Sequence, residues 1–210
     1  EGLVTEILAD IRENLSKINH HGKRADAIVK GMLEHSRANK GEKLPTNLNA
    51  LVDEFVRLSY HGLRAKDKSF NADFKLELDP ELPKVNVVAS DIGRVILNLV
   101  NNAFYAVNDK AKSENVASDY SPTIKVSTNQ IPPEGGKGGR VEIAVQDNGS
   151  GIPDSIQEKI FQPFFTTKPT GSGTGLGLSL SYDIVKAHGG ELKVQSEEEN
   201  GTKFTFNINN

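Results

Sequence analysis

The sequence predicts an α+β domain, with helices on one face of a mixed sheet, preceded by a long N-terminal helix. Apolar residues over positions 3–33 recur with a helical period, which indicates the long helix. Two strands, at 191–196 and 202–208, follow one another through an Asn200–Gly201 turn. Consecutive strands of this kind favour a mixed layer over a doubly wound parallel sheet. At 210 residues, the chain suits one large domain or one domain with a helical attachment.

The charge and cysteine content exclude several classes of function. Lys and Arg total 25 against 28 Asp and Glu, a net charge of -3, so no nucleic-acid partner is expected. The absence of cysteine removes disulfides and thiolate chemistry and fits a reducing, cytoplasmic location. No apolar run approaches the roughly 20 residues that span a bilayer, so we expect no direct membrane contact in these residues. A membrane anchor in the upstream part of a longer parent protein is compatible with this.

The N-terminal helical stripe needs a partner. Its length exceeds that of a typical globular helix and is typical of a coiled coil or bundle, although folding back onto its own domain is the alternative. Because the chain begins inside this pattern, we expect a fragment of a longer protein. Gly41 and Pro45 then interrupt the helix. The predicted organisation is a helix at 1–40, a linker at 41–47 and a second domain at 48–210.

The remaining elements follow from capping residues and periodicity. Asn47 is expected to cap a second helix that lies on the sheet. Phe70, Phe74, Leu76 and Leu78 include an alternating run that predicts a strand, and positions 85–87 predict a short extended piece. A third helix is predicted at 90–110, strands at 124–127 and 141–145 joined by a loop rich in Gly and Pro at 132–139, and a last helix at 178–188.

Asn98 and Asn102 lie one turn apart on the predicted helix 90–110, so both carboxamides emerge from one face. The pattern alone leaves two interpretations. The amides can satisfy neighbouring backbone groups inside the domain, or they can face a ligand. Carboxamide oxygens suit Mg²⁺, which keeps several waters and takes further oxygens from nucleotide phosphates.

The run 147–152, Asp-Asn-Gly-Ser-Gly-Ile, directly follows a predicted strand. Its carboxylate can accept a hydrogen bond from an exocyclic amino group such as that of adenine, and Gly149 and Gly151 allow the backbone to approach a flat ligand. A simple tight turn is the alternative, because Asp and Asn before Gly are common turn formers. The aromatic run 161–165 is interpreted as core or lid packing.

Residues 171–178 contain four alternate glycines that lead into the last helix. Such a segment directs backbone N–H groups into one concavity, and the helix N-terminus adds partial positive charge, so it suits triphosphate oxygens. The Lys-Ser/Thr of a P-loop and the preceding strand of a dinucleotide fold are both missing. A flexible linker is disfavoured because Leu176 and Leu178 accompany the glycines.

Four segments resemble, in order and approximate spacing, the N, G1, F and G2 boxes of sensor histidine kinases. They are residues 98–103, 147–152, 161–168 and 173–178. The end of the chain is also similar, so the match covers roughly 45–210. The resemblance implies the Bergerat ATP-binding fold, an α/β sandwich shared with type II topoisomerases, mismatch-repair ATPases and heat-shock chaperones. It further implies the catalytic domain of a two-component kinase that transfers the γ-phosphate of ATP to histidine, with ATP and Mg²⁺ as cofactors.

The resemblance also assigns roles to residues. Asp147 would accept from the adenine amino group, Asn102 would coordinate magnesium and Asn98 would assist one turn earlier. Lys168 would be a charge partner for the phosphates at the start of a lid. Tyr105 stands where many family members have a basic residue, so one phosphate contact is in question. The other nucleotide-binding positions carried over are Gly149, Gly151, Ile152, Thr167, Gly173, Thr174, Gly175, Leu176, Gly177, Leu178 and Thr202.

Hydrolytic members of the wider superfamily carry a Glu base where this chain has Asn98. An amide cannot abstract a proton from water, so transfer to a protein histidine is expected rather than brisk hydrolysis. The family's acceptor lies in a run similar to His-Glu-x-x-x-Pro-Leu, which this chain lacks. His20, His21 and His35 are interpreted as helix-surface or interface residues. Residues 3–37 resemble the second helix of the dimerising hairpin, which places the acceptor upstream of Glu1.

The family resemblance implies a response regulator as partner and a homodimer for the full-length protein. Two alternatives stay open. The same ATP-binding fold can serve as a non-catalytic regulatory or docking module, and a hydrolytic ATPase is the third, less favoured interpretation because of Asn98. An acceptor motif in the upstream reading frame would distinguish the histidine kinase from the docking module.

Overall fold

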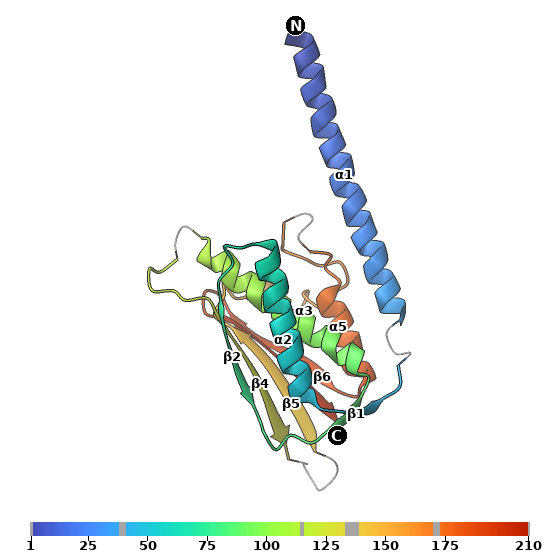
Figure 1. The fold of residues 1–210 in the computed structure, drawn as a ribbon, viewed down its shortest axis with the longest axis vertical. Helices are drawn as coiled ribbons and strands as arrows, with labels where there is room; N and C mark the ends of the chain where they lie inside the picture. Colours follow the sequence, from blue (N-terminus) through green and yellow to red (C-terminus); the bar gives the residue numbers. More distant parts are fainter. Residues whose placement is uncertain (1, 38–40, 114–115, 133–138, 170–172, 210) are drawn as a thin grey trace.

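The computed structural model describes residues 2–37, 41–113, 116–132, 139–169 and 173–209 (Figure 1). A long helix is followed by a layer of helices packed on a sheet. In chain order the elements are α1 (Gly2–Arg37), β1 (Leu44–Thr46), α2 (Leu48–Lys66), β2 (Asp73–Leu78), β3 (Val85–Val87), α3 (Ala89–Ala111), β4 (Thr123–Ile131), β5 (Arg140–Asp147), α4 (Asp154–Gln157), α5 (Gly177–Ala187), β6 (Glu191–Glu197) and β7 (Gly201–Asn209).

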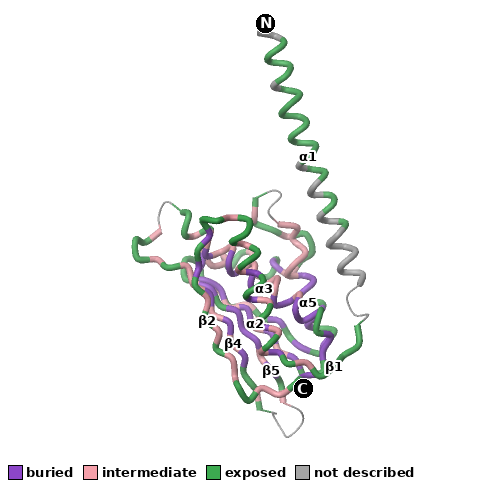
Figure 2. The backbone as a smooth tube through the Cα atoms, viewed as in Figure 1, coloured by how far each residue is buried: buried purple, intermediate pink, exposed green. Residues whose placement is uncertain are grey.

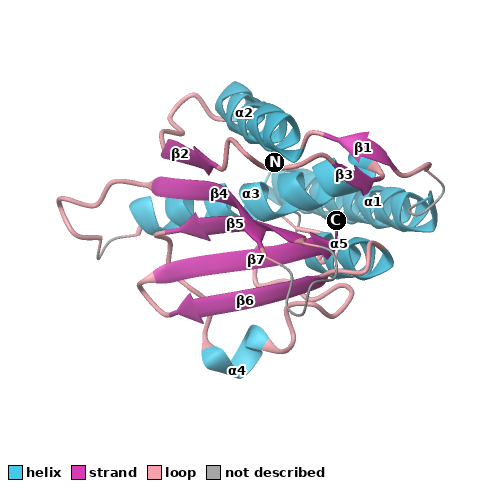
Figure 3. Cartoon of the chain, turned by 90° about the horizontal axis from the view of Figure 1, so that it is seen from below, coloured by secondary structure: helices cyan, strands magenta, loops and turns pink. Residues whose placement is uncertain are grey.

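The main sheet has the strand order β2-β4-β5-β7-β6 (Figure 3). Strands β2 and β4 are parallel, whereas the other neighbouring pairs are antiparallel. The sheet is therefore mixed, as the sequence predicted. The pairing of β5 with β7 sets Asp147 opposite Thr202, which brings the end of one motif against a residue 55 positions away.

The core lies between the sheet and α3, with α2 and α5 beside that helix (Figure 2). Apolar residues of α3 recur every three or four positions on the face toward β4 and β5, and all are almost fully buried. They are Ile92, Val95, Ile96, Leu99, Val100, Ala103, Phe104 and Val107. The opposing strands contribute alternate residues such as Ile124, Ile143 and Phe206. This packing confirms helices on one face of a mixed sheet.

Polar groups fasten the ends of the helices. The Asn47 side chain accepts a hydrogen bond from the Ala50 amide at 3.1 Å, which confirms the predicted cap of α2. His188, at the end of α5, is buried, and its Nε2 accepts from the Val88 amide at 3.1 Å. Its Nδ1 lies 2.8 Å from the Ile184 carbonyl oxygen. The imidazole therefore ties the end of α5 to the start of α3, a structural role.

The structure adds elements that periodicity did not reveal. Residues 44–46, inside the segment expected to be a linker, form β1 and pair antiparallel with β3. Three residues carry too little alternation to signal a strand. The single-turn helix α4 is likewise too short for a helical stripe. Phe70 is a core residue ahead of β2 rather than part of that strand. Most of the Gly-rich and Pro-rich loop, at 133–138, lies outside the described residues.

Helix α1 extends away from the layered domain (Figure 1) and spans the segment predicted to be helical. The large apolar side chains of α1 whose burial the structure describes are exposed, with Val4 at 62% and Ile18 at 67% of their full accessibility. Ile7, Ile11 and Leu15 lie on the same helix and are exposed as well. The described part of the stripe is thus not covered by the chain's own domain. None of the helices in the described residues is apolar enough over a sufficient length to cross a membrane.

We predict that Leu99→Ala, in the buried face of α3, lowers the free energy of unfolding by about 2–5 kcal/mol, because it removes apolar contacts and leaves a cavity. Leu58→Ala, on α2 at 55% exposure, is the matched control and should change stability by less than about 0.5 kcal/mol. Urea denaturation measures both. Equal effects would contradict the assignment of α3 as the centre of the core.

Candidate nucleotide-binding site

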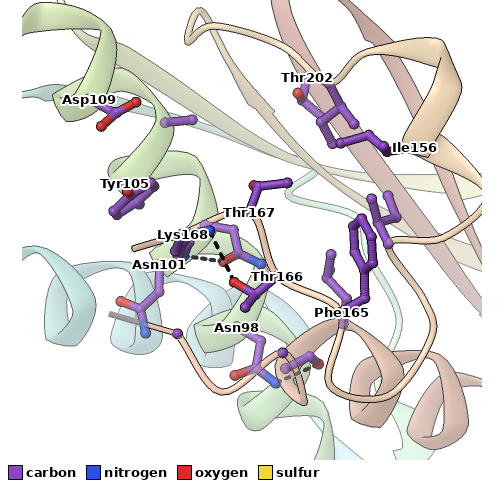
Figure 4. Close-up of a pocket in the computed structure, with 18 of the residues that line it drawn as sticks. Asn98, Asn101, Tyr105, Asp109, Ile156, Phe165, Thr166, Thr167, Lys168 and Thr202 are labelled. Carbon is purple, nitrogen blue, oxygen red and sulfur yellow. Dashed lines mark hydrogen bonds between the residues drawn. The ribbon is translucent and has the colours of Figure 1, made fainter. Parts of the chain in front are cut away.

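A cavity of about 880 Å³ lies between α3, the segment after β5 and the segment before α5 (Figure 4). This volume suits a nucleotide-sized ligand. All but two of the predicted site residues line it; Gly149 and Leu176 do not. The lining positions among them are Asn98, Asn102, Tyr105, Asp147, Gly151, Ile152, Thr167, Lys168, Gly173, Thr174, Gly175, Gly177, Leu178 and Thr202.

Asp147 lies at the end of β5, buried in the wall of the cavity. Its Oδ1 accepts from the amides of Gly149, at 2.9 Å, and Thr202, at 3.3 Å. Both contacts among the described residues use the same oxygen, so Oδ2 is available to a ligand donor. Burial raises the pKa of Asp147 to about 6, while the two amides and Lys110 act in the opposite direction.

The turn after Asp147 is built against the β6–β7 hairpin. Gly151 has a φ of +74°, and a Cβ at this position would overlap the Glu197 carbonyl oxygen. The Ile152 amide donates to the Ser196 hydroxyl at 2.8 Å, and that hydroxyl lies 2.8 Å from the Thr202 hydroxyl. The hairpin therefore fixes the backbone that closes one end of the cavity.

Polar residues that sequence analysis did not single out support the same turn from the other side. The Asn148 Oδ1 accepts from the Thr123 amide at 2.9 Å and from the Tyr120 hydroxyl at 3.2 Å. Lys110, near the end of α3, contacts the carbonyl oxygens of Gly149 and Glu199. These side chains join α3, β4 and the hairpin behind Asp147.

Asn98 joins two helices at the cavity edge. Its Nδ2 donates to the Gly177 carbonyl oxygen at 3.1 Å and to the Ser181 hydroxyl at 3.2 Å. The amide thus holds the first turn of α5 against α3. The sequence left two roles open for this amide: bonding to neighbouring groups inside the domain, or facing a ligand. Asn98 bonds neighbouring groups and also lines the cavity.

Asn102, one turn further along α3, faces a cation of the same chain. Its Oδ1 accepts from the Lys168 ammonium at 2.8 Å. That ammonium lies 4.3 Å from the centre of the Tyr105 ring, within the range of a cation–π interaction (Figure 4). Burial lowers the pKa of Lys168. The segment after the aromatic run therefore folds over the polar face of α3.

The glycine-rich segment is described from residue 173 onward, and Gly171 and Ser172 of the predicted motif lie outside the described residues. Gly175 has a φ of +70°, and a Cβ there would overlap the backbone of Phe164. Helix α5 begins two residues later, after Leu176, which provides no side-chain cap. Gly177 and Leu178 line the cavity at this helix start, so the positive end of the helix dipole borders the cavity.

Several lining residues were not predicted. On α3 they include Asn101 and Asp109, which continue the three- and four-residue spacing of Asn98, Asn102 and Tyr105. That periodicity was a usable signal. Ile156 and Ile160 come from α4 and the turn after it, a region with no recognised pattern, so no sequence signal pointed to them.

The residues present fit a nucleotide and a phosphate-bound divalent ion. The cavity combines a buried carboxylate at one end with a helix start and an ammonium at the other. Within the described residues no group of three or more His, Cys, Asp or Glu forms a metal cluster. A magnesium ion here would rely on the Asn102 oxygen together with phosphates and water, which matches its preference for hydrated, oxygen-rich sites.

Comparison with known proteins places the chain in a family. The family model for histidine kinase-, DNA gyrase B-, and HSP90-like ATPases matches residues 87–210, which is more than half of the chain. The chain belongs to this family, and it carries the ATP-binding catalytic domain of a sensor histidine kinase.

Individual relatives support the assignment to this family. The signal transduction histidine-protein kinase AtoS of Escherichia coli (strain K12) is 35% identical over 202 residues, which are 96% of this chain and 28% of that protein. The sensory histidine kinase/phosphatase NtrB of Rhizobium meliloti (strain 1021) is 31% identical, over 88% of this chain and 46% of that protein. The solved catalytic domain of the histidine kinase ThkA superposes with a TM-score of 0.56 at 35% identity, over 75% of this chain and 91% of that domain. The chain spans about a third of the length of the first curated relatives it matches.

We predict that Asp147→Asn stabilises the nucleotide-free chain at pH 7.5 by up to about 3 kcal/mol. Because its pKa is about 6 in the folded chain against an ordinary 3.8, folding favours the protonated carboxyl. The wild-type free energy of unfolding should therefore fall, relative to the variant, as the pH rises from about 4 to 6, and the difference should level off above that range. The Asn Oδ1 keeps both backbone hydrogen bonds.

Urea denaturation of both proteins at a series of pH values measures this difference. A difference that does not change between pH 4 and 7.5 would show that Asp147 carries no burial cost.

Proposed function

We propose that this domain binds ATP with magnesium and transfers the γ-phosphate to a histidine of its parent protein. The observation that carries the proposal is the arrangement of one cavity. A buried carboxylate lies at one end, and an amide oxygen, an ammonium and a helix N-terminus lie at the other. These are the groups that recognise an amino-substituted base and a triphosphate respectively.

Adenine recognition rests on Asp147. Its Oδ1 is held by two backbone amides, which orients the carboxylate and leaves Oδ2 without a hydrogen bond among the described residues. An acceptor oxygen in this position matches the exocyclic amino group of adenine and opposes the carbonyl oxygen of guanine. Thr202 and Ile152 border the same end of the cavity.

Phosphate binding rests on the opposite end. The start of α5 offers backbone amides and the positive end of a helix dipole, and Lys168 provides a full positive charge. Asn102 would hold the magnesium ion, which, when bound, neutralises charge on the phosphates during transfer. Gly173, Thr174 and Gly175 approach the same region.

Asn98 favours transfer over hydrolysis. Its amide donates to Gly177 and Ser181, and an amide has no basic group that could activate water. The attacking nucleophile therefore comes from a protein side chain. We infer that this acceptor is a histidine outside these 210 residues, since the sequence holds no run similar to His-Glu-x-x-x-Pro-Leu.

The exposed apolar stripe of α1 supports a homodimer of the parent protein, because a helix with such a stripe is stabilised by a second helix. The phosphorylated histidine would then pass its phosphate to a response regulator. A surface on the paired helices is the expected place for that contact.

We predict that calorimetric titration shows magnesium-dependent ATP binding in the micromolar range with clear preference over GTP. Asp147→Asn should weaken ATP binding about ten- to a hundredfold, because an NH₂ replaces the acceptor oxygen while the backbone contacts survive. Asp154→Asn, an exposed aspartate on α4, is the matched control. Equal affinity of wild type and Asp147→Asn would mean that adenine is not recognised at this residue.

We predict that the chain retains no acid-labile phosphate after incubation with γ-labelled ATP, whereas the parent protein does. The double variant His20→Gln, His21→Gln of the parent should label as strongly as wild type. Loss of labelling in that variant would place the acceptor on α1. An unlabelled parent that still binds ATP would instead favour a docking module.

A further inference from the structure

Lys168 is bound to the amide oxygen that the proposed function assigns to magnesium. Its Nζ donates to Asn102 Oδ1 at 2.8 Å, and both residues line the nucleotide cavity. The nucleotide-free chain therefore already carries a cation at this oxygen. Since one amide oxygen is the only metal-binding group that we assign here, the ammonium and a metal ion are competitors for the same atom.

Two further contacts position Lys168. The ammonium lies against the face of the Tyr105 ring, 4.3 Å from Nζ to the ring centre (Figure 4). The backbone of Lys168 donates to the Thr166 hydroxyl at 3.2 Å, which shapes the segment that carries the side chain. The cation thus comes from one wall of the cavity and is received by an oxygen and an aromatic face of the other.

We infer that Lys168 is a resident cation of the nucleotide site and sets how strongly nucleotide binding depends on magnesium. This inference rests on the proposed function. Metal-free ATP binds by pairing its phosphates with the Lys168 ammonium, which lies in a cavity where charges are weakly screened. Asn102 Oδ1 would hold the ion of magnesium-loaded ATP in place of the ammonium. Tyr105 acts as a positioning residue for Lys168.

Removal of the ammonium changes the affinity for metal-free ATP and the affinity for magnesium-loaded ATP in opposite directions. Metal-free ATP loses its cationic partner and binds more weakly. Magnesium-loaded ATP loses a competitor for Asn102 and carries less phosphate charge for Lys168 to neutralise. The ratio of the dissociation constant in EDTA to that in magnesium therefore increases.

The test is titration of wild type and Lys168→Met with ATP in EDTA and in magnesium. We expect the ratio of dissociation constants to rise about tenfold in the variant. Methionine keeps the length and apolar stem of lysine and removes the charge. Lys186→Met is the matched control, because Lys186 also stacks on an aromatic ring, Tyr182, but does not line the cavity. Its ratio should equal that of wild type.

A second pair of variants tests the positioning role of Tyr105. Tyr105→Phe keeps the aromatic face and should keep the wild-type ratio, whereas Tyr105→Leu removes it and should raise the ratio in the direction of Lys168→Met. An unchanged ratio in Lys168→Met, with ATP binding intact, would overturn the inference and leave the proposed function standing. Failure of the wild-type chain to bind ATP in either buffer would overturn both.

Discussion

The structure depends on the burial of one face of α3 between the sheet and its two neighbouring helices. Residues such as Val95 and Leu99 must point into the core, and the helical repeat then determines the direction of every other side chain on α3. Asn98, Asn102 and Tyr105 consequently face the cavity from the most firmly packed element of the domain. The polar end of the cavity is thus oriented by apolar packing, and the segment that carries Lys168 packs against it through Asn102 and Tyr105.

At the Asp147 end of the cavity, a free hydrogen-bond acceptor and high stability have opposite requirements. The Asp147 carboxylate is buried and held through one oxygen by two amides, and its burial raises the pKa of the group to about 6. The surrounding structure offsets this cost with Lys110 and two backbone amides. Such residues are expected at binding sites, where the sequence that gives the highest stability is different from the one that binds.

The sequence predicted the order of the main elements and most of the cavity, because α3 and the long strands carry strong periodicity and the glycine motifs have few alternatives. It did not predict β1 or α4, which are too short to show a period. Nor could it show that Asn98 bonds to α5 or that Lys168 reaches Asn102, since these contacts join residues 79 and 66 positions apart. The support of the turn after Asp147 by Lys110 and Tyr120 was missed for the same reason: local patterns do not reveal which distant polar groups meet.

The position of β7 inside the sheet has a consequence for synthesis on the ribosome. Strand β7 lies between β5 and β6, and its Thr202 completes the hydrogen bonds of Asp147. A nascent chain that has emerged only as far as β6 therefore exposes one side of β5 and lacks the cavity wall that Thr202 and Phe204 provide. The cavity is complete only after the β6–β7 hairpin has left the exit tunnel. Until then the unpaired β5 is the edge that chaperones would have to protect.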